Sequence, residues 1–201
     1  MKKILPFFSY LFHPIFIPVF GTLGYFLFNE NYFDTEQKFL ILLQIVLITI
    51  FIPISFFFLL RSLGKVDSVM VSELSQRKIP LIIQAILILI LIQKSITIDR
   101  IPELYFFFLG GLISTLIALI FLFLKIKASI HMIGISTLTA FVIGLSFHNQ
   151  INIISTIAFL ILMNGFVASS RLTMNAHTNK ELVIGFFSGM LPQVVLWYFW
   201  L

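Results

Sequence analysis

A series of long apolar runs, recurring from one end of the chain to the other, most constrains how this sequence can fold. A membrane-spanning helix needs about 20 largely apolar residues. Lipid also forces each segment to pair its own backbone groups. We therefore predict an all-α, polytopic helical membrane protein with seven spans. They lie near residues 5–28, 39–60, 79–92, 104–124, 132–147, 153–167 and 182–201, and the third, fifth and sixth are short.

The composition excludes several other classes of protein. Hydrophobic residues make up 60% of the chain and charged residues only 10%, against about 45–50% and about 25% in soluble domains. A soluble domain and a disordered chain are both excluded. The absence of cysteine rules out disulfides, thiolate metal sites and a cysteine nucleophile. No nucleic-acid-binding motif is present, and we expect one membrane domain over residues 1–201.

Prolines and small or polar residues predict local features of the spans. Pro14 and Pro18 predict a kink in the first span, and Pro80 and Pro102 are typical of helix starts. Glycines and two amides predict close helix packing and hydrogen bonds between helices. These are Gly110, Gly111, Gly185, Gly189, Asn164 and Gln193.

Counting spans places the N-terminus and the polar segments 61–78, 125–131 and 169–181 on one face of the membrane. That face carries 10 of the 13 lysines and arginines, while the other carries five of the eight acids. The positive-inside rule predicts that the first face is cytoplasmic. Setting aside Arg77, Lys127 and Arg171 as candidate anion ligands leaves seven bases against three, so the bias persists.

Segment 169–181 contains the strongest candidate site. His177 and Glu181 are spaced four apart, so on a helix they share one face. The carboxylate would hold one imidazole nitrogen as N–H and leave a lone pair on the other, for nucleophilic or base chemistry. Arg171 carries a planar fork suited to phosphate oxygens. The alternative is a membrane-surface helix with solvated charges.

The other two segments on this face add complementary groups. Ser129 is placed to cap a helix whose free N–H groups favour an anion, and His131 then becomes a candidate general acid. Lys127 and Arg77 add positive charge. Alternatively, these are a capped span, a snorkelling lysine and ordinary boundary bases. Taken together, two histidines with an Arg/Lys/Ser cradle suit phosphoryl transfer through a phosphohistidine. No carboxylate cluster supports a metal site.

At these residues the sequence resembles the type-2 phosphatidic acid phosphatase superfamily, which includes the vanadium haloperoxidases. Its third motif, Ser-Arg-x5-His-x3-Asp, is matched by Ser170, Arg171, His177 and Glu181, with Glu replacing Asp. The second, Pro-Ser-Gly-His, is matched in part by Ala128-Ser129-Ile130-His131. In the first, Lys-x6-Arg-Pro, Arg77 matches the arginine, Pro80 comes two positions late and Met70 stands in place of the lysine.

The resemblance implies a six-helix core plus one extra span, and a lipid phosphate or pyrophosphate substrate in a bacterial inner membrane. It implies that His177 is the nucleophile, Glu181 its orienting carboxylate and His131 the general acid. Phosphate would be bound by Arg77, Lys127, Ser129 and Arg171, without metal or cofactor. Bacterial members of the family often face the periplasm, against the charge bias of this chain.

Two other functions stay open. The missing lysine and the altered second motif also fit a catalytically inactive protein that binds lipids or anions with the same fold. A small transporter is disfavoured, because ionisable residues that mark transport paths are scarce in the spans. Of the remaining histidines, His13 either lines the site or, as we prefer, lies at the interface, and His148 is expected to be solvated.

Overall fold

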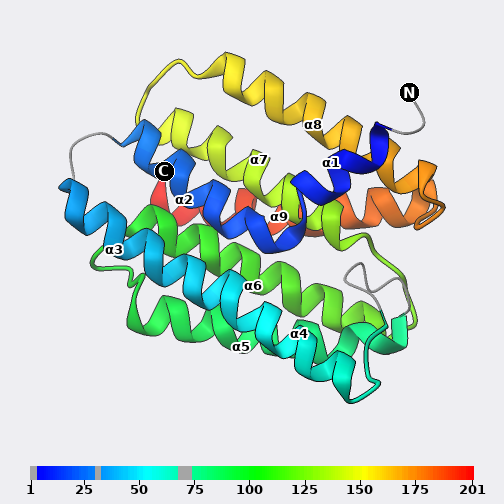
Figure 1. Cartoon of the computed structure of the whole chain (residues 1–201). Helices are drawn as coiled ribbons and strands as arrows, with labels where there is room; N and C mark the ends of the chain where they lie inside the picture. The colour runs from blue at the N-terminus through cyan, green and yellow to red at the C-terminus, as the bar shows by residue number, and fades with distance from the viewer. Residues whose placement is uncertain (1–3, 30–32, 68–73) are drawn as a thin grey trace.

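The seven predicted spans are confirmed in a computed structural model, which describes residues 4–29, 33–67 and 74–201. The helices long and apolar enough to cross a membrane are Leu5–Phe28, Thr35–Ser62, Gln76–Lys94, Pro102–Phe123, Ile130–His148, Ile154–Thr173 and Asn179–Trp200. They form an all-helical bundle (Figure 1). Met70, the position of the missing lysine, lies outside the described residues.

Two spans are interrupted and the other five are single helices. The elements are α1 (Leu5–Leu11), the 3-10 turn η1 (Pro14–Phe16), α2 (Ile17–Phe28), α3 (Thr35–Val46), the π-helical turn η2 (Leu47–Phe51), α4 (Ile52–Ser62), α5 (Leu74–Lys94), α6 (Pro102–Phe123), α7 (Ile130–His148), α8 (Ile154–Thr173) and α9 (Asn179–Trp200). The ends of α4, α6 and α8 and the starts of α5, α7 and α9 lie at one end of the bundle, as the span count predicts (Figure 1).

The predicted kink in the first span is confirmed and is sharp. α1 ends before His13, and the chain resumes as the turn η1 with Pro14 at its first position. Proline cannot supply the backbone N–H that would continue the first helix. The break lets the two halves pack differently: α1 lies against α8, and α2 lies against α7 (Figure 1).

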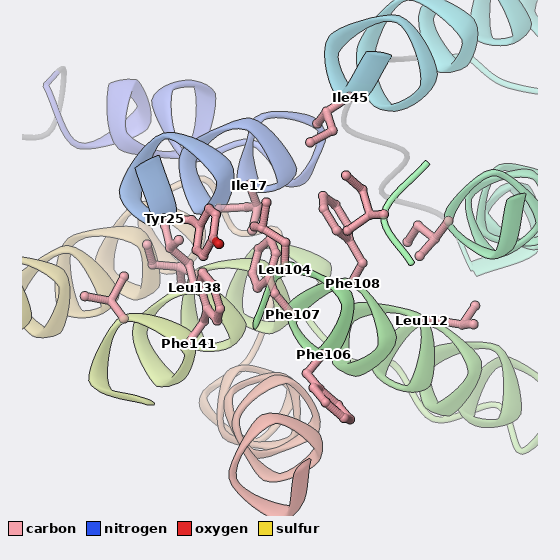
Figure 2. Packing of buried hydrophobic residues seen from close by; sticks show 14 of the residues in the cluster. Ile17, Tyr25, Ile45, Leu104, Phe106, Phe107, Phe108, Leu112, Leu138 and Phe141 are labelled. Carbon is pink, nitrogen blue, oxygen red and sulfur yellow. The ribbon is translucent and has the colours of Figure 1, made fainter. Parts of the chain in front are cut away.

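Helix α7 is the central helix and is the most buried of the spans. Figure 2 shows side chains of α2, α6 and α7 interleaving around it, with the Phe107 and Phe141 ring centroids 4.5 Å apart. Close approach of α9 to α7 is confirmed at Gly185 and Gly189. A methyl group on Gly185 would lie 2.5 Å from the Ser129 carbonyl oxygen, so only glycine admits this contact.

The predicted hydrogen bonds between helices are also confirmed. Asn164 donates to the Thr139 hydroxyl at 2.7 Å, and Gln193 donates to the Phe107 carbonyl at 2.8 Å. Gln193 also fills the space above Gly110, as close packing requires, but the prediction is wrong for Gly111, where an added methyl would meet nothing within 4 Å. Gly111 instead opens onto a cavity.

The predicted short spans are longer than expected, because their helices continue past the last apolar residue. α8 extends six residues beyond 167, to Thr173, and includes Arg171. α5 begins by Leu74, so Pro80 lies inside the helix rather than at its start. Proline costs one hydrogen bond there, early in the helix. These extensions carry polar side chains toward the protein interior. Span boundaries drawn from hydropathy stop before these residues and so do not predict that they are helical.

At the opposite end of the bundle, His148 is exposed, as expected, and it also makes two contacts that the sequence does not predict. Its Nε2 lies 3.3 Å from Oε1 of Glu103, which is buried at the start of α6. Its ring also packs on Trp200, with 5.4 Å between centroids. The ends of α6, α7 and α9 converge at this point, so a residue that reads as a loop histidine becomes a helix-to-helix contact.

Candidate functional site

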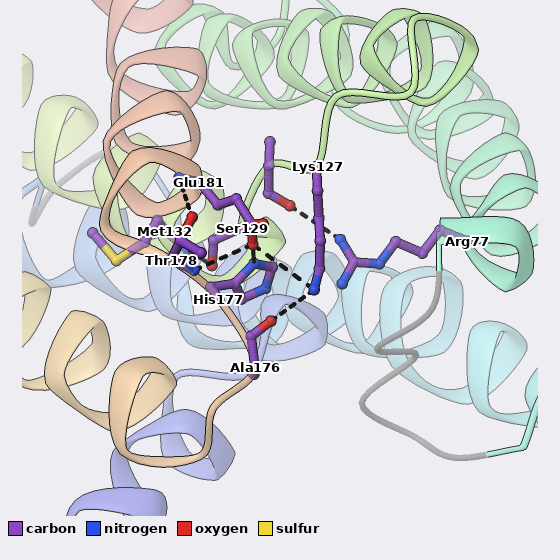
Figure 3. Close-up of polar contacts among 9 residues, drawn as sticks. Arg77, Lys127, Ser129, Met132, Ala176, His177, Thr178 and Glu181 are labelled. Carbon is purple, nitrogen blue, oxygen red and sulfur yellow. Dashed lines mark hydrogen bonds and ion pairs between the residues drawn. The ribbon is translucent and has the colours of Figure 1, made fainter.

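The three polar segments meet at one end of the bundle. Arg77, near the start of α5, donates to the Ala128 carbonyl at 3.0 Å. Lys127 donates to the Ala176 carbonyl at 2.9 Å. These contacts join the α6–α7 segment to α5 on one side and to the α8–α9 loop on the other (Figure 3). Segments separated by about 50 positions in the sequence therefore form one site.

The His177–Glu181 pair forms, but not on one helix face as predicted. His177 precedes the helix, Thr178 is the N-cap of α9, and Glu181 completes a capping box with it. The Glu181 carboxylate oxygen Oε2 lies 2.7 Å from Nδ1 of His177. A carboxylate accepts, so Nδ1 carries the proton and Nε2 holds the lone pair. The capping box fixes Glu181, and Glu181 fixes the imidazole.

Lys127 lies against the same carboxylate. Its Nζ is 3.8 Å from Oε2 of Glu181, and Figure 3 shows it between Glu181, the Ala176 carbonyl and the Arg77 side chain. Lys127 thus holds the loop that carries His177. Among the described residues, Lys127, Ser129 and Glu181 do not line the neighbouring cavity, whereas Arg77 and His177 do.

Ser129 is the N-cap of α7, as predicted, and its hydroxyl accepts from the Met132 N–H at 3.5 Å. It is fully buried. Its own N–H donates to the carbonyl of Glu181 at 3.1 Å. The start of α7 is thereby tied to the first turn of α9, which sets the distance between His131 and His177.

His131 lies in the first turn of α7 and is buried. Its ring bonds to the backbone of Ser9, while its Nε2 has no hydrogen-bond partner among the described residues. Because the Ser9 carbonyl can only accept and Nε2 has no partner, we infer that Nδ1 is the nitrogen that faces Ser9 and that Nε2 carries the lone pair in the neutral ring. A buried nitrogen without a partner is costly, and this one belongs to a residue that lines the cavity.

The N-terminal span supplies residues that sequence reasoning missed or misplaced. Ser9 is fully buried and its hydroxyl lies 2.6 Å from that of Ser170. His13 sits in the break between α1 and η1 and lines the cavity, which supports the alternative that we did not prefer. Its ring is perpendicular to that of His131, with 5.1 Å between centroids. The His-Pro pair at a predicted kink was the available signal for His13; Ser9 had none.

Two buried arginines face this cavity. Arg171, at the end of α8, is one of the largest fully buried side chains, and Arg77 is almost as enclosed. In the part of the chain that the structure describes, these two arginines and Lys127 gather near the Glu181 carboxylate and the His177 ring. Positive groups brought together in this way favour binding of an anion. The guanidinium forks of the two arginines suit the oxygens of a phosphate ester.

The cavity joins this polar end to the interior of the bundle. Its volume is about 430 Å³, and its walls come from η1, α2, α4, α5, α6 and α7. Along α5 the lining runs from Arg77 to Ile88, about 16 Å at the helical rise. That is about half the hydrocarbon thickness of a bilayer. The deep part is apolar, with Phe107 and Phe108 among its lining residues.

The pKa of His177 is lowered to about 4, with burial as the largest cause. The hydrogen bond to Glu181 raises this pKa, and the charges of Arg77, Arg171 and Lys127 lower it. An unfolded histidine has a pKa of about 6.5. Between these values the unfolded chain binds the extra proton, so the free energy of unfolding falls as pH drops from about 6.5 to 4.

Because Asn can also donate to Glu181, His177→Asn is the matched variant. We expect thermal unfolding in detergent to show a smaller loss of stability over this range in that variant than in wild type; equal losses would contradict the assignment.

No three His, Asp or Glu side chains in the described ranges are grouped to hold a metal ion. No protein-family model, curated protein or solved structure matches the chain.

Proposed function

We propose that this protein is an integral membrane phosphatase that removes phosphate from a lipid phosphate or pyrophosphate through a phosphohistidine. One observation carries the proposal: His177, oriented by Glu181, lies beside two buried arginines at the polar end of an apolar cavity. The imidazole supplies a nucleophile whose lone pair is on Nε2. The arginines supply the charge that a phosphoryl group needs as it transfers.

In the first step, Nε2 of His177 attacks phosphorus and the bond from phosphorus to the ester oxygen breaks. The negative charge of the bound substrate favours a proton on Nε2 of His131. His131 gives this proton to the leaving oxygen, so the lipid departs as an alcohol, or as a monophosphate if the substrate is a pyrophosphate. Arg77 and Arg171 bind the phosphoryl oxygens. Glu181 stabilises the positive charge that develops on the His177 ring.

In the second step, water attacks the phosphohistidine. His131, now neutral, takes one proton from the water as its oxygen bonds to phosphorus. The bond between phosphorus and nitrogen breaks, and its electron pair returns to Nε2 of His177. Inorganic phosphate leaves, and both histidines regain their starting states. Lys127 and Ser129 contact Glu181 rather than the cavity, so we assign them positioning roles instead of the direct phosphate contacts that the sequence suggested.

The apolar chamber supports a lipid substrate. A phosphate bound between Arg77 and Arg171 leaves the chamber beyond Gly111 for a hydrocarbon tail. The test is phosphate release by the detergent-purified protein from phosphatidate, phosphatidylglycerol phosphate and isoprenyl pyrophosphates, in excess EDTA. Turnover on at least one is expected. A folded protein that binds these lipids without turnover would replace the proposal with the inactive binding protein.

The chamber predicts a specific effect of Gly111→Leu. The new side chain has room, because an added methyl meets nothing within 4 Å, yet it occupies space that a tail would use. We expect kcat/KM to fall on the order of tenfold for a long-chain lipid phosphate and to stay within about twofold for p-nitrophenyl phosphate. Gly165→Leu is the control, because Gly165 has equal space but does not line the cavity. Equal losses on both substrates would argue against a tail in this chamber.

The charge bias leads us to propose that the site end faces the cytoplasm. The chain has no cysteine, so an Asn179→Cys variant carries one reactive thiol at an exposed position near the site. In intact cells we expect a membrane-impermeant thiol reagent to label it only after permeabilisation. Labelling without permeabilisation would place the site on the outer face.

A further inference from the structure

His13 lies in the same cavity as the two proposed catalytic histidines, His131 and His177, although it is more than 100 positions from them in sequence. The break at Pro14 makes it the N-cap of η1, at the point where the first span turns toward α7. It lines the cavity with Arg77, Arg171 and both proposed catalytic histidines. The mechanism above gives it no task.

The backbone of η1 determines which nitrogen of His13 carries a proton. Pro14 has no N–H, so Ile15 supplies the first donor of the turn. The Ile15 N–H donates to Nδ1 of His13 at 3.3 Å. A nitrogen that accepts must hold a lone pair, so the neutral ring of His13 carries its proton on Nε2.

His131 has the opposite arrangement, with its proton on Nδ1 facing Ser9 and its lone pair on Nε2. The two rings are perpendicular with centroids 5.1 Å apart. His13 therefore adds an N–H donor without adding charge, on a ring that lines the cavity next to the His131 ring. Arg171, Arg77 and His177 also face this region. Before an anion binds, another positive charge there would be unfavourable, which favours a neutral donor.

We propose, resting on the phosphatase function above, that His13 contacts the substrate by donating its Nε2–H to a phosphate oxygen next to the oxygen that leaves. It is then a binding residue for the transferring phosphoryl group, together with the two arginines. The broken first span becomes part of the site because it is what delivers this donor. Without the break, His13 would continue the helix of α1 and lose its Nδ1 contact.

Two substitutions separate this role from capping. In His13→Asn, the amide oxygen can replace the Nδ1 acceptor and keep the cap, but no donor reaches the position of Nε2. In His13→Gln, the amide N–H can reach that position, but the cap is lost. We expect His13→Asn to lower kcat/KM about 10- to 100-fold with an unchanged melting temperature. We expect His13→Gln to retain at least several-fold more activity than His13→Asn. The reverse order would overturn the proposal in favour of a cap alone.

A measurement without turnover keeps the proposal separate from the proposed function. The chain has only four histidines, so their ¹⁵N signals can be assigned by single substitutions in the full-length protein. We expect Nε2–H for His13 and Nδ1–H for His131. Inorganic phosphate should shift the His13 signals in wild type and also in His177→Ala, where the chemistry is blocked.

Shifts at His13 in a protein that releases no phosphate would support the contact and overturn only the catalytic function. Two outcomes would overturn the contact and leave the phosphatase intact. In the first, the protein turns over substrate but phosphate does not shift the His13 signals. In the second, the protein turns over substrate but His13 carries its proton on Nδ1. Absence of any shift at His13, His131 and His177 would overturn both.

Discussion

His177→Ala is expected to reduce phosphate release from the best lipid substrate by at least about 10³-fold. The substitution removes the only atom proposed to bond to phosphorus, so no intermediate can form, and what remains is the contribution of the arginines and of substrate binding. The measurement is phosphate release in excess EDTA. A second readout is the radioactive label that stays on the protein when a reaction with radiolabelled substrate is quenched. This label should be alkali-stable and acid-labile in wild type and absent in the variant.

Glu181→Gln is the graded control for this result. A glutamine can still accept from the Thr178 N–H and complete the capping box, so the start of α9 should be preserved. It loses the charge that stabilises the His177 ring, and activity should fall by an intermediate factor of about 10- to 100-fold. Full activity in His177→Ala would refute the mechanism. Equal loss of folded protein in both variants would instead identify the pair as a structural cap.

Much of the fold follows from the apolar runs, because a chain in lipid must close its backbone hydrogen bonds within each span. The end of the bundle at which each polar segment lies then depends only on the number of spans before it. The amino-acid sequence alone therefore places Arg77, His131 and His177 at one end of the bundle. The contact between His177 and Glu181 also followed from their spacing. It forms through a capping box, however, and not through two successive turns of one helix.

What could not be predicted depends on neighbours that are distant in sequence. The polar boundary near residue 167 does not end α8, because Arg171 turns into the protein rather than toward water. His13 reads as a residue at a helix end, but it lines the cavity because α1 and α2 pack on different helices. His148 stays exposed, yet its ring nitrogen contacts the buried Glu103. No periodicity along the chain encodes either contact.

His131→Asn is expected to have an effect that depends on the leaving group. Asparagine can replace Nδ1 as the donor to the Ser9 carbonyl, so the start of α7 should be preserved, but the variant has no acid at the position of Nε2. An alkoxide is a poor leaving group without a proton, and kcat/KM on a lipid phosphate should fall about 10²- to 10⁴-fold. A p-nitrophenolate leaves without protonation, so turnover of p-nitrophenyl phosphate should fall by less than about tenfold.

This difference between substrates is what a merely structural role cannot reproduce. If His131 only packs against Ser9 and His13, its loss should disturb binding of the phosphoryl group equally for both substrates. A similar fall on both would therefore remove His131 from the reaction and transfer the task of general acid to another group, with His13 as the neighbouring candidate. A double variant of His13 and His131 would then show whether the two residues act on the same proton. If they do, the loss of activity in the double variant is smaller than the product of the losses in the two single variants.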